Sequence, residues 1–319
     1  RIKNFNIECD KKSGGIHAAT SLSKFKEYEN DLRYKLKTYN YDKLEVLDKA
    51  TADHEIGSSL YYGGILDRGA GHLHPLKYAI GLMNAALSLG VKVYENSPAK
   101  KILQDSTDIE VLIENGKVNA KKIAVCCNAY IEGLNLGIEN KVMPCETYIV
   151  CTEPLNSDLQ QNILPNDYCV SDTNFDLNYY RLSESKRMIF GGAVGYSLKN
   201  VEGLKKRTKK QLNRVFPQLK NINVDYIWGG LIAITVNRVP DIGMINEKIF
   251  YAQGFSGHGV AFTGIAGKIL AENIVSGKTS EMEAFEKIKH RNFPGGRLFR
   301  MPLLVTISAM QRMMDIFNV

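Results

Sequence analysis

The chain has 319 residues, of which 44% are hydrophobic and 24% charged, a composition typical of a soluble globular protein with room for two domains. The net charge is +7, and the basic run at residues 205–210 is interpreted as a solvated helix face, so nucleic acid is not expected as a partner. No apolar stretch approaches the roughly 20 residues needed to cross a bilayer.

The six cysteines form no CxxC pair and show no Cys/His ligand spacing, so they predict neither a metal site nor a disulfide framework. We therefore expect reduced thiols and a cytoplasmic protein. The chain begins at Arg1 without a signal peptide, so we expect it to start within a longer protein or after processing.

The first part of the chain mixes helix and strand signals. A helix is expected at residues 23–39, and another between Pro75 and Gly90, because proline suits a first helical turn and glycine a helix end. The second helix is almost entirely apolar, so we expect it to be buried on all sides. A short strand at 91–93 and a β-meander at 100–127 should follow, with Asn115 and Gly116 as a type I′ turn.

The character of the chain then changes twice. Short β-like runs dominate residues 140–228 and predict an antiparallel sheet with a basic helix near 203–215, inserted as a second domain. Residues 247–277 return to a strand, a glycine turn and a helix. The expected parts are 1–62 and 140–228 for the substrate domain, 63–139 and 229–278 for a cofactor-binding domain, and 279–319 for a helical tail.

The sharpest local signal is the turn GFSGHG at Gly254–Gly259, between a buried strand and a helix. Three glycines in six residues let the backbone approach a ligand closely. The free N–H groups and the dipole at the helix start favour an anion or an electron-rich carbonyl oxygen. The alternative is that the glycines only shape a tight turn. The dinucleotide fingerprint GxGxxG, with an acidic residue about 20 positions later, is absent.

The order of sequence blocks resembles the FAD-dependent superfamily of glycine, sarcosine and D-amino-acid oxidases. The matching blocks are GHLHPLKYAIGLMNAALSLGVKVYENSPAKKI, IAVCCNAYI, MIFGG, WGGLIAITVNRVPDIGMI and IFYAQGFSGHGVAFTGIAGKILAENI, and they span most of residues 57–277. GHLHPL, WGG…ITVNRVP and HRNFPGGRLFR most resemble the gamma-glutamylputrescine oxidase branch. The resemblance implies a mixed α/β fold: a three-layer FAD/NAD(P)-binding-like domain, incomplete at its N-terminus, with an inserted antiparallel-sheet substrate domain.

The resemblance also implies roles at matching positions. Ala99 would contact the adenine-ribose side of FAD, and Cys127 and Asn128 would line the cofactor. The pyrimidine end of the flavin would lie against the turn residues Gly254, Phe255, Ser256, Gly257, His258, Gly259 and Val260. The candidate wall of the substrate site consists of Tyr62, Tyr180, Arg181 and Thr235. Each of these residues also has an ordinary structural interpretation, and no catalytic residue is identified.

One departure from the family pattern bears on the substrate. The sarcosine-oxidase branch has a lysine, two residues after the last glycine of the turn, that holds the substrate carboxylate, whereas this chain has Ala261. Without that cation an α-carboxylate loses a partner worth ~1.5–3 kcal/mol. We therefore expect oxidation of an amine without an adjacent carboxylate, such as gamma-glutamylputrescine or a related polyamine derivative. Hydride would pass to the flavin, the imine would yield an aldehyde, and O2 or a quinone would accept the electrons.

Two other functions stay open at this stage. The chain could be an amino-acid oxidase or dehydrogenase acting on glycine, sarcosine or a D-amino acid. It could also be a non-catalytic fragment or subunit that cannot hold FAD alone, because the GxGxxG segment is missing. The apolar stretch MPLLVTISAMQRMM in the tail is expected to pack on its own domain, with contact to a membrane surface as the alternative.

Overall fold

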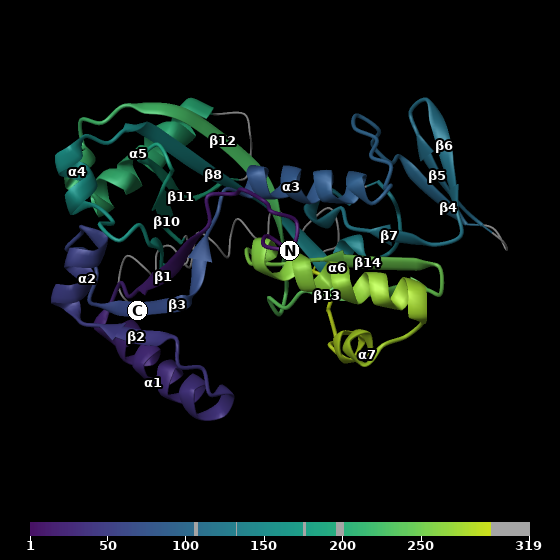
Figure 1. Ribbon diagram of the computed structural model, residues 1–319, viewed down its shortest axis with the longest axis horizontal. Coiled ribbons are helices and arrows are strands. Elements are labelled where there is room, and N and C mark those ends of the chain that lie inside the picture. The colour runs from purple at the N-terminus through teal and green to yellow at the C-terminus, as the bar shows by residue number, and fades with distance from the viewer. Residues whose placement is uncertain (105–107, 132, 175–176, 196–200, 295–319) are drawn as a thin grey trace. The chain divides into compact units, whose positions relative to one another are not determined.

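The chain divides into two compact units built from interleaved segments (Figure 1). The computed structural model describes residues 1–104, 108–131, 133–174, 177–195 and 201–294. Unit 1 contains Arg1–Val91 and Thr147–Gly230, and unit 2 contains Lys92–Glu146 and the described residues from Leu231 onward.

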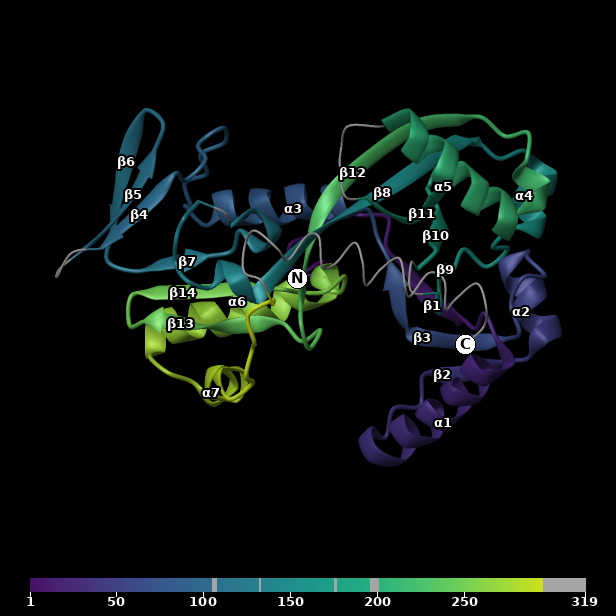
Figure 2. The same cartoon turned by 180° about the vertical axis from the view of Figure 1, so that it is seen from behind.

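Unit 1 is built on an eight-stranded sheet with the strand order β12-β8-β11-β10-β9-β1-β3-β2 (Figure 2). The strands are β1 Lys12–Ala18, β2 Leu44–Leu47, β3 Gly64–His72, β8 Val142–Pro154, β9 Cys169–Asp172, β10 Tyr179–Leu182, β11 Arg187–Gly195 and β12 Val224–Thr235. The neighbouring strands β2, β3 and β1 pair antiparallel, as do β9, β10 and β11. Strands β1 and β9 pair in parallel, so the sheet is mixed rather than purely antiparallel.

One face of this sheet carries the main core of unit 1. Helices α2 (Lys49–Ile56), α4 (Ser157–Asn162) and α5 (Val201–Val215) and the 3-10 turn η3 (Pro217–Leu219) contribute side chains to it. Tyr61, Phe190 and Phe216 are its largest fully buried members. Tyr180 stacks on Phe190 at 5.5 Å between ring centroids and meets Phe216 edge-on. The aromatic packing fixes the orientation of β10.

Two further helices of unit 1 begin and end where the sequence signals lie. Helix α1 (Leu22–Tyr39) is capped by the Ser21 side chain, which accepts a hydrogen bond from the Lys24 amide, and it ends at Asn40 in a left-handed conformation. Helix α3 (Pro75–Ser88) has proline in its first turn. The helices expected at 23–39 and from Pro75 are thus confirmed within one or two residues.

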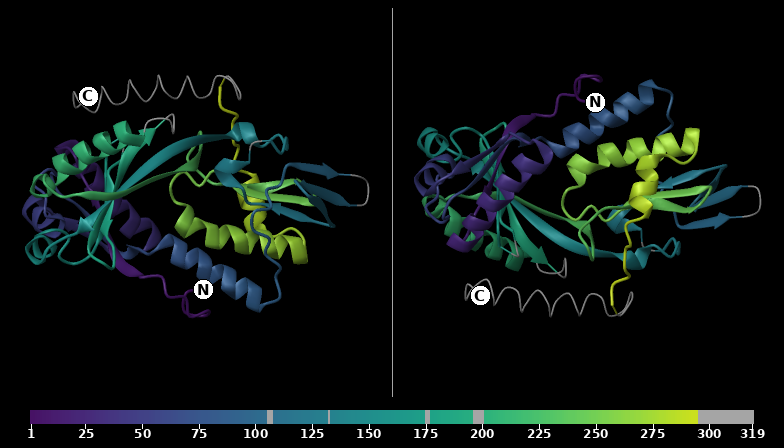
Figure 3. Two further views of the ribbon diagram at one scale, coloured as in Figure 1. Left: turned by 90° about the horizontal axis from the view of Figure 1, so that it is seen from above. Right: turned by 90° about the horizontal axis from the view of Figure 1, so that it is seen from below.

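Unit 2 contains two three-stranded sheets. The meander consists of β4 Lys101–Gln104, β5 Ile109–Ile113 and β6 Gly116–Ala120, and the second sheet of β13 Asp241–Asn246, β14 Ile249–Gln253 and β7 Ile123–Val125. Strands β14 and β7 run parallel. Helix α6 (Gly259–Ser276) lies along this second sheet, and α7 (Ser280–Glu286) packs beside β13 (Figure 3). The 3-10 turns η1 (Asn128–Tyr130) and η2 (Glu139–Lys141) complete the unit.

Two expectations about local structure were wrong. Residues 91–93 form no strand. Apolar and polar residues alternate over only three positions there, and this segment pairs with none of the described strands. The hairpin loop is Glu114–Asn115, one residue earlier than expected, and neither residue has the positive φ of a type I′ turn. Residues 63–91 group with unit 1, where β3 pairs with β1 and β2.

The burial of the helix at 75–90 was also predicted wrongly. None of the residues of α3 is buried in the described structure, and Leu76 and Ile80 are 63% and 45% exposed. An apolar helix is buried only where neighbouring segments cover it, and on α3 the Ile7 side chain packs closely against Gly81.

None of the described helices has the length and apolarity to span a bilayer. The apolar stretch of the tail lies outside the described residues.

The core of unit 1 yields a stability prediction. Tyr180 donates a hydrogen bond to the Tyr61 hydroxyl at 3.1 Å inside the core. Tyr180→Phe keeps the ring packing and removes this bond, so the free energy of unfolding should fall by about 1 kcal/mol in urea denaturation. Tyr226→Phe, which alters a ring that is 58% exposed, should change it little. Equal effects of the two variants would contradict this interpretation of the core.

Candidate functional site

The turn Gly254–Gly259 connects β14 to α6 and has an unusual backbone. Gly254, Ser256 and Gly257 have φ values of +72°, +50° and +95°. A side chain at position 254 would place its Cβ 2.4 Å from the Thr235 methyl group, so only glycine fits there. No atom of the described residues lies within 4 Å of a Cβ built on Gly257, so the backbone is approachable at that residue.

Hydrogen bonds fix this turn from neighbouring segments. The Gly254 N–H donates to Asn128 Oδ1 at 2.9 Å, and the Ser256 N–H donates to the Ala233 carbonyl at 2.9 Å. The Ser256 hydroxyl donates to the Gly254 carbonyl at 3.1 Å. Asn128 follows β7, the parallel neighbour of β14, so the two carboxyl strand ends meet at this turn.

The start of α6 has open backbone donors. His258 occupies the N-cap position without a side-chain cap, and the first helical bond runs from the Phe262 N–H to the His258 carbonyl at 3.1 Å. The N–H groups of Gly259, Val260 and Ala261 have no partner among the described residues, and the Val260 residue is 54% exposed. Such a helix start attracts an anion or a polarised carbonyl oxygen.

The remaining cofactor candidates lie in the same unit but differ in their relation to the turn. Asn128 contacts it directly, and Cys127, the residue before it, is half-buried against the core of unit 2. Ala99 is exposed in the irregular segment before β4, and no hydrogen bond joins it to the turn. The structure therefore brings Asn128 to the glycine turn and leaves Ala99 apart from it.

Two of the substrate candidates are interior residues. Tyr180 is 3% exposed and bonds Tyr61 in the core of unit 1, so its expected place on a substrate wall has to be corrected. Thr235 is 1% exposed, and its hydroxyl donates to the Val239 carbonyl at 2.8 Å. The hydroxyl groups of both residues are thus engaged within the protein.

Strand alternation explains why Tyr180 and Arg181 cannot share a face. Neighbouring residues of a strand point to opposite sides, so Tyr180 enters the core while Tyr179 and Arg181 share the other face of the sheet. On that face the Ser171 hydroxyl and His17 Nδ1 lie 3.1 Å apart. Tyr62, before β3, is 50% exposed.

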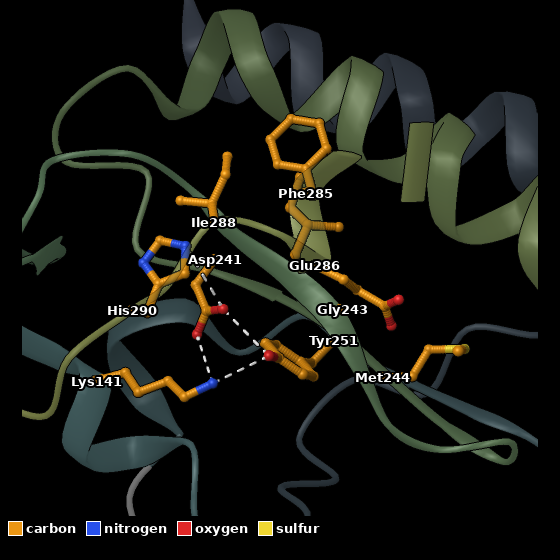
Figure 4. Close-up of a pocket in the computed structure, with 10 residues that line it drawn as sticks. Lys141, Asp241, Gly243, Met244, Tyr251, Phe285, Glu286, Ile288 and His290 are labelled. Carbon is orange, nitrogen blue, oxygen red and sulfur yellow. Dashed lines mark hydrogen bonds and ion pairs between the residues drawn. The ribbon is translucent and has the colours of Figure 1, made fainter. Parts of the chain in front are cut away.

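A polar cluster around Asp241 in unit 2 is not indicated by any sequence signal (Figure 4). It lines a cavity of about 240 Å³ between β13, β14, η2 and the segment after α7. The Asp241 carboxylate lies 3.7 Å from Lys141 and 3.9 Å from His290, and it accepts a hydrogen bond from Tyr251 at 3.1 Å. Burial raises the pKa of Tyr251, and the nearby carboxylate raises it further.

His290 is the titratable member of this Asp241 cluster. Its side chain is 4% exposed, and neither ring nitrogen has a hydrogen-bond partner among the described residues. Burial lowers the pKa of His290, although the Asp241 carboxylate acts in the opposite direction. The imidazole is therefore neutral near neutral pH, and Lys141 is the cation that balances Asp241.

Comparison with known proteins assigns the chain to a family. Residues 1–273 match the family model of the FAD dependent oxidoreductases, DAO. The chain belongs to this family. It is 36% identical over 316 residues to gamma-glutamylputrescine oxidoreductase of Escherichia coli (strain K12), covering 99% of this chain and 74% of that relative. It is 35% identical over 304 residues to the probable oxidoreductase OrdL of Haemophilus influenzae, covering 94% and 69% of the two chains.

Solved structures support the fold. L-Proline dehydrogenase from P. horikoshii superposes with a TM-score of 0.75 at 20% identity, over 89% of this chain and 78% of that one. The mixed α/β fold expected from the sequence is confirmed, and the family makes the chain an FAD-dependent oxidoreductase and an enzyme. Among the described residues, the uncapped start of α6 is a feature that suits this cofactor.

The neutral state of His290 predicts a pH effect. Its native pKa is lowered, so the unfolded chain binds the proton more readily, and stability present above the ordinary histidine pKa is lost as the pH falls below about 6.5. His290→Gln removes this loss. The drop in the free energy of unfolding between about pH 7.5 and about pH 5 should therefore be smaller in the variant.

The control for this measurement is His54→Gln. The His54 side chain is 75% exposed, so its replacement should leave the acid sensitivity of the protein unchanged. An acid-induced loss of stability that is the same in wild type and His290→Gln would contradict the neutral, buried state of His290.

Proposed function

We propose that this enzyme binds the pyrimidine edge of FAD at the start of α6 and oxidises an amine. The observation that carries the proposal is the row of open N–H groups at Gly259, Val260 and Ala261. They follow a turn in which Gly254 has no space for a side chain. Gly257 adds a surface that no side chain covers. The anchoring bond from Gly254 to Asn128 keeps these donors in place.

The protein contributes position and polarity to this chemistry. When bound, FAD supplies the acceptor for a hydride from the carbon next to the amine nitrogen. The backbone donors of α6 favour the negative charge that reduction places on the pyrimidine edge, because they are pre-oriented and need no reorganisation. The imine product then reacts with water to give an aldehyde and ammonia. An amine that binds in its deprotonated form requires no dedicated base.

The proposed substrate class is supported by the absence of a cationic side chain at position 261. Ala261, in the first turn of α6, supplies no cation where a lysine would hold an α-carboxylate, so sarcosine and glycine lack a charged partner there. The 36% identity to gamma-glutamylputrescine oxidoreductase favours the same direction. We propose gamma-glutamylputrescine or a related polyamine derivative as substrate, with O2 or a quinone as electron acceptor and the cytoplasm as the location.

The alternative is an amino-acid oxidase, since glycine oxidase of Bacillus subtilis is also a relative, at 23% identity over 254 residues. A substrate panel with purified, flavin-loaded protein separates the two. Gamma-glutamylputrescine should be oxidised, as measured by peroxide release or dye reduction, and sarcosine should be a poor substrate. Ala261→Lys should raise kcat/KM for sarcosine about tenfold or more. Fast turnover of sarcosine by the wild type would overturn the substrate assignment.

A charge placed at the start of α6 tests the cofactor position. His258→Asp puts a carboxylate beside the open N–H groups, where it competes with the flavin edge and repels its negative charge. The affinity for FAD should fall about tenfold or more, and the flavin reduction potential should become more negative. His258→Asn, which is neutral, should have the smaller effect in the same titration. Unchanged FAD affinity in His258→Asp would refute this position.

A further inference from the structure

We propose that Asp241 is a positioning residue of the flavin site, whose buried carboxylate holds the end of β14 from which the turn Gly254–Gly259 starts. The inference rests on the proposed function, because the position of the turn matters for catalysis only if the turn receives the flavin. Asp241 would not touch the cofactor. It would act through Gln253, the last residue of β14.

The carboxylate binds two alternate residues of β14. Asp241 is 2% exposed, and its Oδ1 accepts from the Tyr251 hydroxyl at 3.1 Å while its Oδ2 accepts from Gln253 Nε2 at 3.0 Å. Asp241 and Gln253 are also direct partners in the ladder between β13 and β14. Side-chain and main-chain bonds thus fix the same pair of residues, immediately before Gly254.

The same residues connect further segments to this strand end. Gln253 Nε2 also donates to the Ile138 carbonyl at 2.9 Å, which ties β14 to the chain before η2. Lys141 in η2 donates to the Tyr251 hydroxyl at 3.3 Å. From the other side, His290 and Glu286 of the α7 region line the cavity beside the carboxylate (Figure 4). Asp241 therefore lies where four segments of unit 2 meet.

The charges make this arrangement depend on Asp241. A buried carboxylate is costly without a partner, and here Lys141 supplies the opposite charge while Tyr251 and Gln253 supply the hydrogen bonds. Glu286 is engaged by Lys278 at 2.6 Å, and His290 is neutral. Replacing Asp241 by asparagine would leave the Lys141 charge unbalanced. It would also replace one of the two acceptor oxygens by an NH2 group, so that either Tyr251 or Gln253 would lose its hydrogen-bond acceptor.

The turn has little freedom to absorb a displacement of Gln253. The next residue, Gly254, is held by Asn128 and is so close to Thr235 that even a methyl group would collide. Gly254, Ser256 and Gly257 all require a left-handed backbone, which permits few alternative paths. A shift of the strand end would therefore move the open N–H groups of α6. Those groups set how strongly negative charge is stabilised at the flavin edge.

Asp241→Asn and Gln253→Met form a double-mutant cycle that tests this coupling. Hydrogen exchange should speed up about tenfold in the peptide spanning residues 254–262 in each single variant. The double variant should be no worse than either single one, because both remove the same link. In flavin-loaded protein, the reduction potential should become more negative in all three variants. Asp167→Asn breaks another aspartate–lysine pair, with Lys186 at 3.4 Å in unit 1, and should change neither readout.

The outcomes separate this inference from the proposed function. Faster exchange confined to the turn, together with non-additive effects, supports the role of Asp241 whether or not an amine is oxidised. A uniform loss of stability with unchanged exchange at the turn and unchanged potential would overturn it. If Asp241→Asn does not fold, Gln253→Met alone decides by the same two readouts. A wild-type protein that binds no flavin would contradict the proposed function. The exchange data would still test the coupling of Asp241 to the turn through Gln253.

Discussion

Throughout the described part of the chain, the first backbone N–H groups of α6 are kept free of protein partners, and the candidate site is built around this feature. A helix start normally recruits a side chain to satisfy these donors. Here His258 provides no cap, and the glycine turn before it keeps side chains away. These donors therefore stay unsatisfied by the described residues and are open to a ligand or water. Binding a polarised carbonyl edge is a natural use of such donors.

Keeping the donors open requires a rigid support. The turn follows a left-handed path that glycine tolerates, and Asn128 anchors its first amide. Behind it, Asp241 and Gln253 pair across β13 and β14 and link the strand end to η2. In the proposed site two tasks are separated: exposed backbone would contact the cofactor, and buried side chains hold that backbone. The chemical specificity of the enzyme can then vary at other positions, such as Ala261, without altering the turn.

The sequence predicts the elements that have strong local signals. The helix after the glycine turn and the meander both follow from glycine placement and apolar periodicity. Tyr180 fails as a wall residue because the family resemblance points to a strand but not to which face each residue takes. The sequence does not reveal Asp241, because its partners lie in three other segments, β14, η2 and the segment after α7, and a buried acid carries no local pattern. The exposure of α3 was likewise not predictable, since burial depends on what covers a helix.

The central claim is that the N–H groups at the start of α6 bind the flavin edge. A crystal structure of the FAD complex tests it most directly. We expect a pyrimidine carbonyl oxygen within about 3.2 Å of at least two of the backbone nitrogens of residues 257–261. A flavin bound elsewhere, with those nitrogens facing solvent or protein side chains, would contradict it.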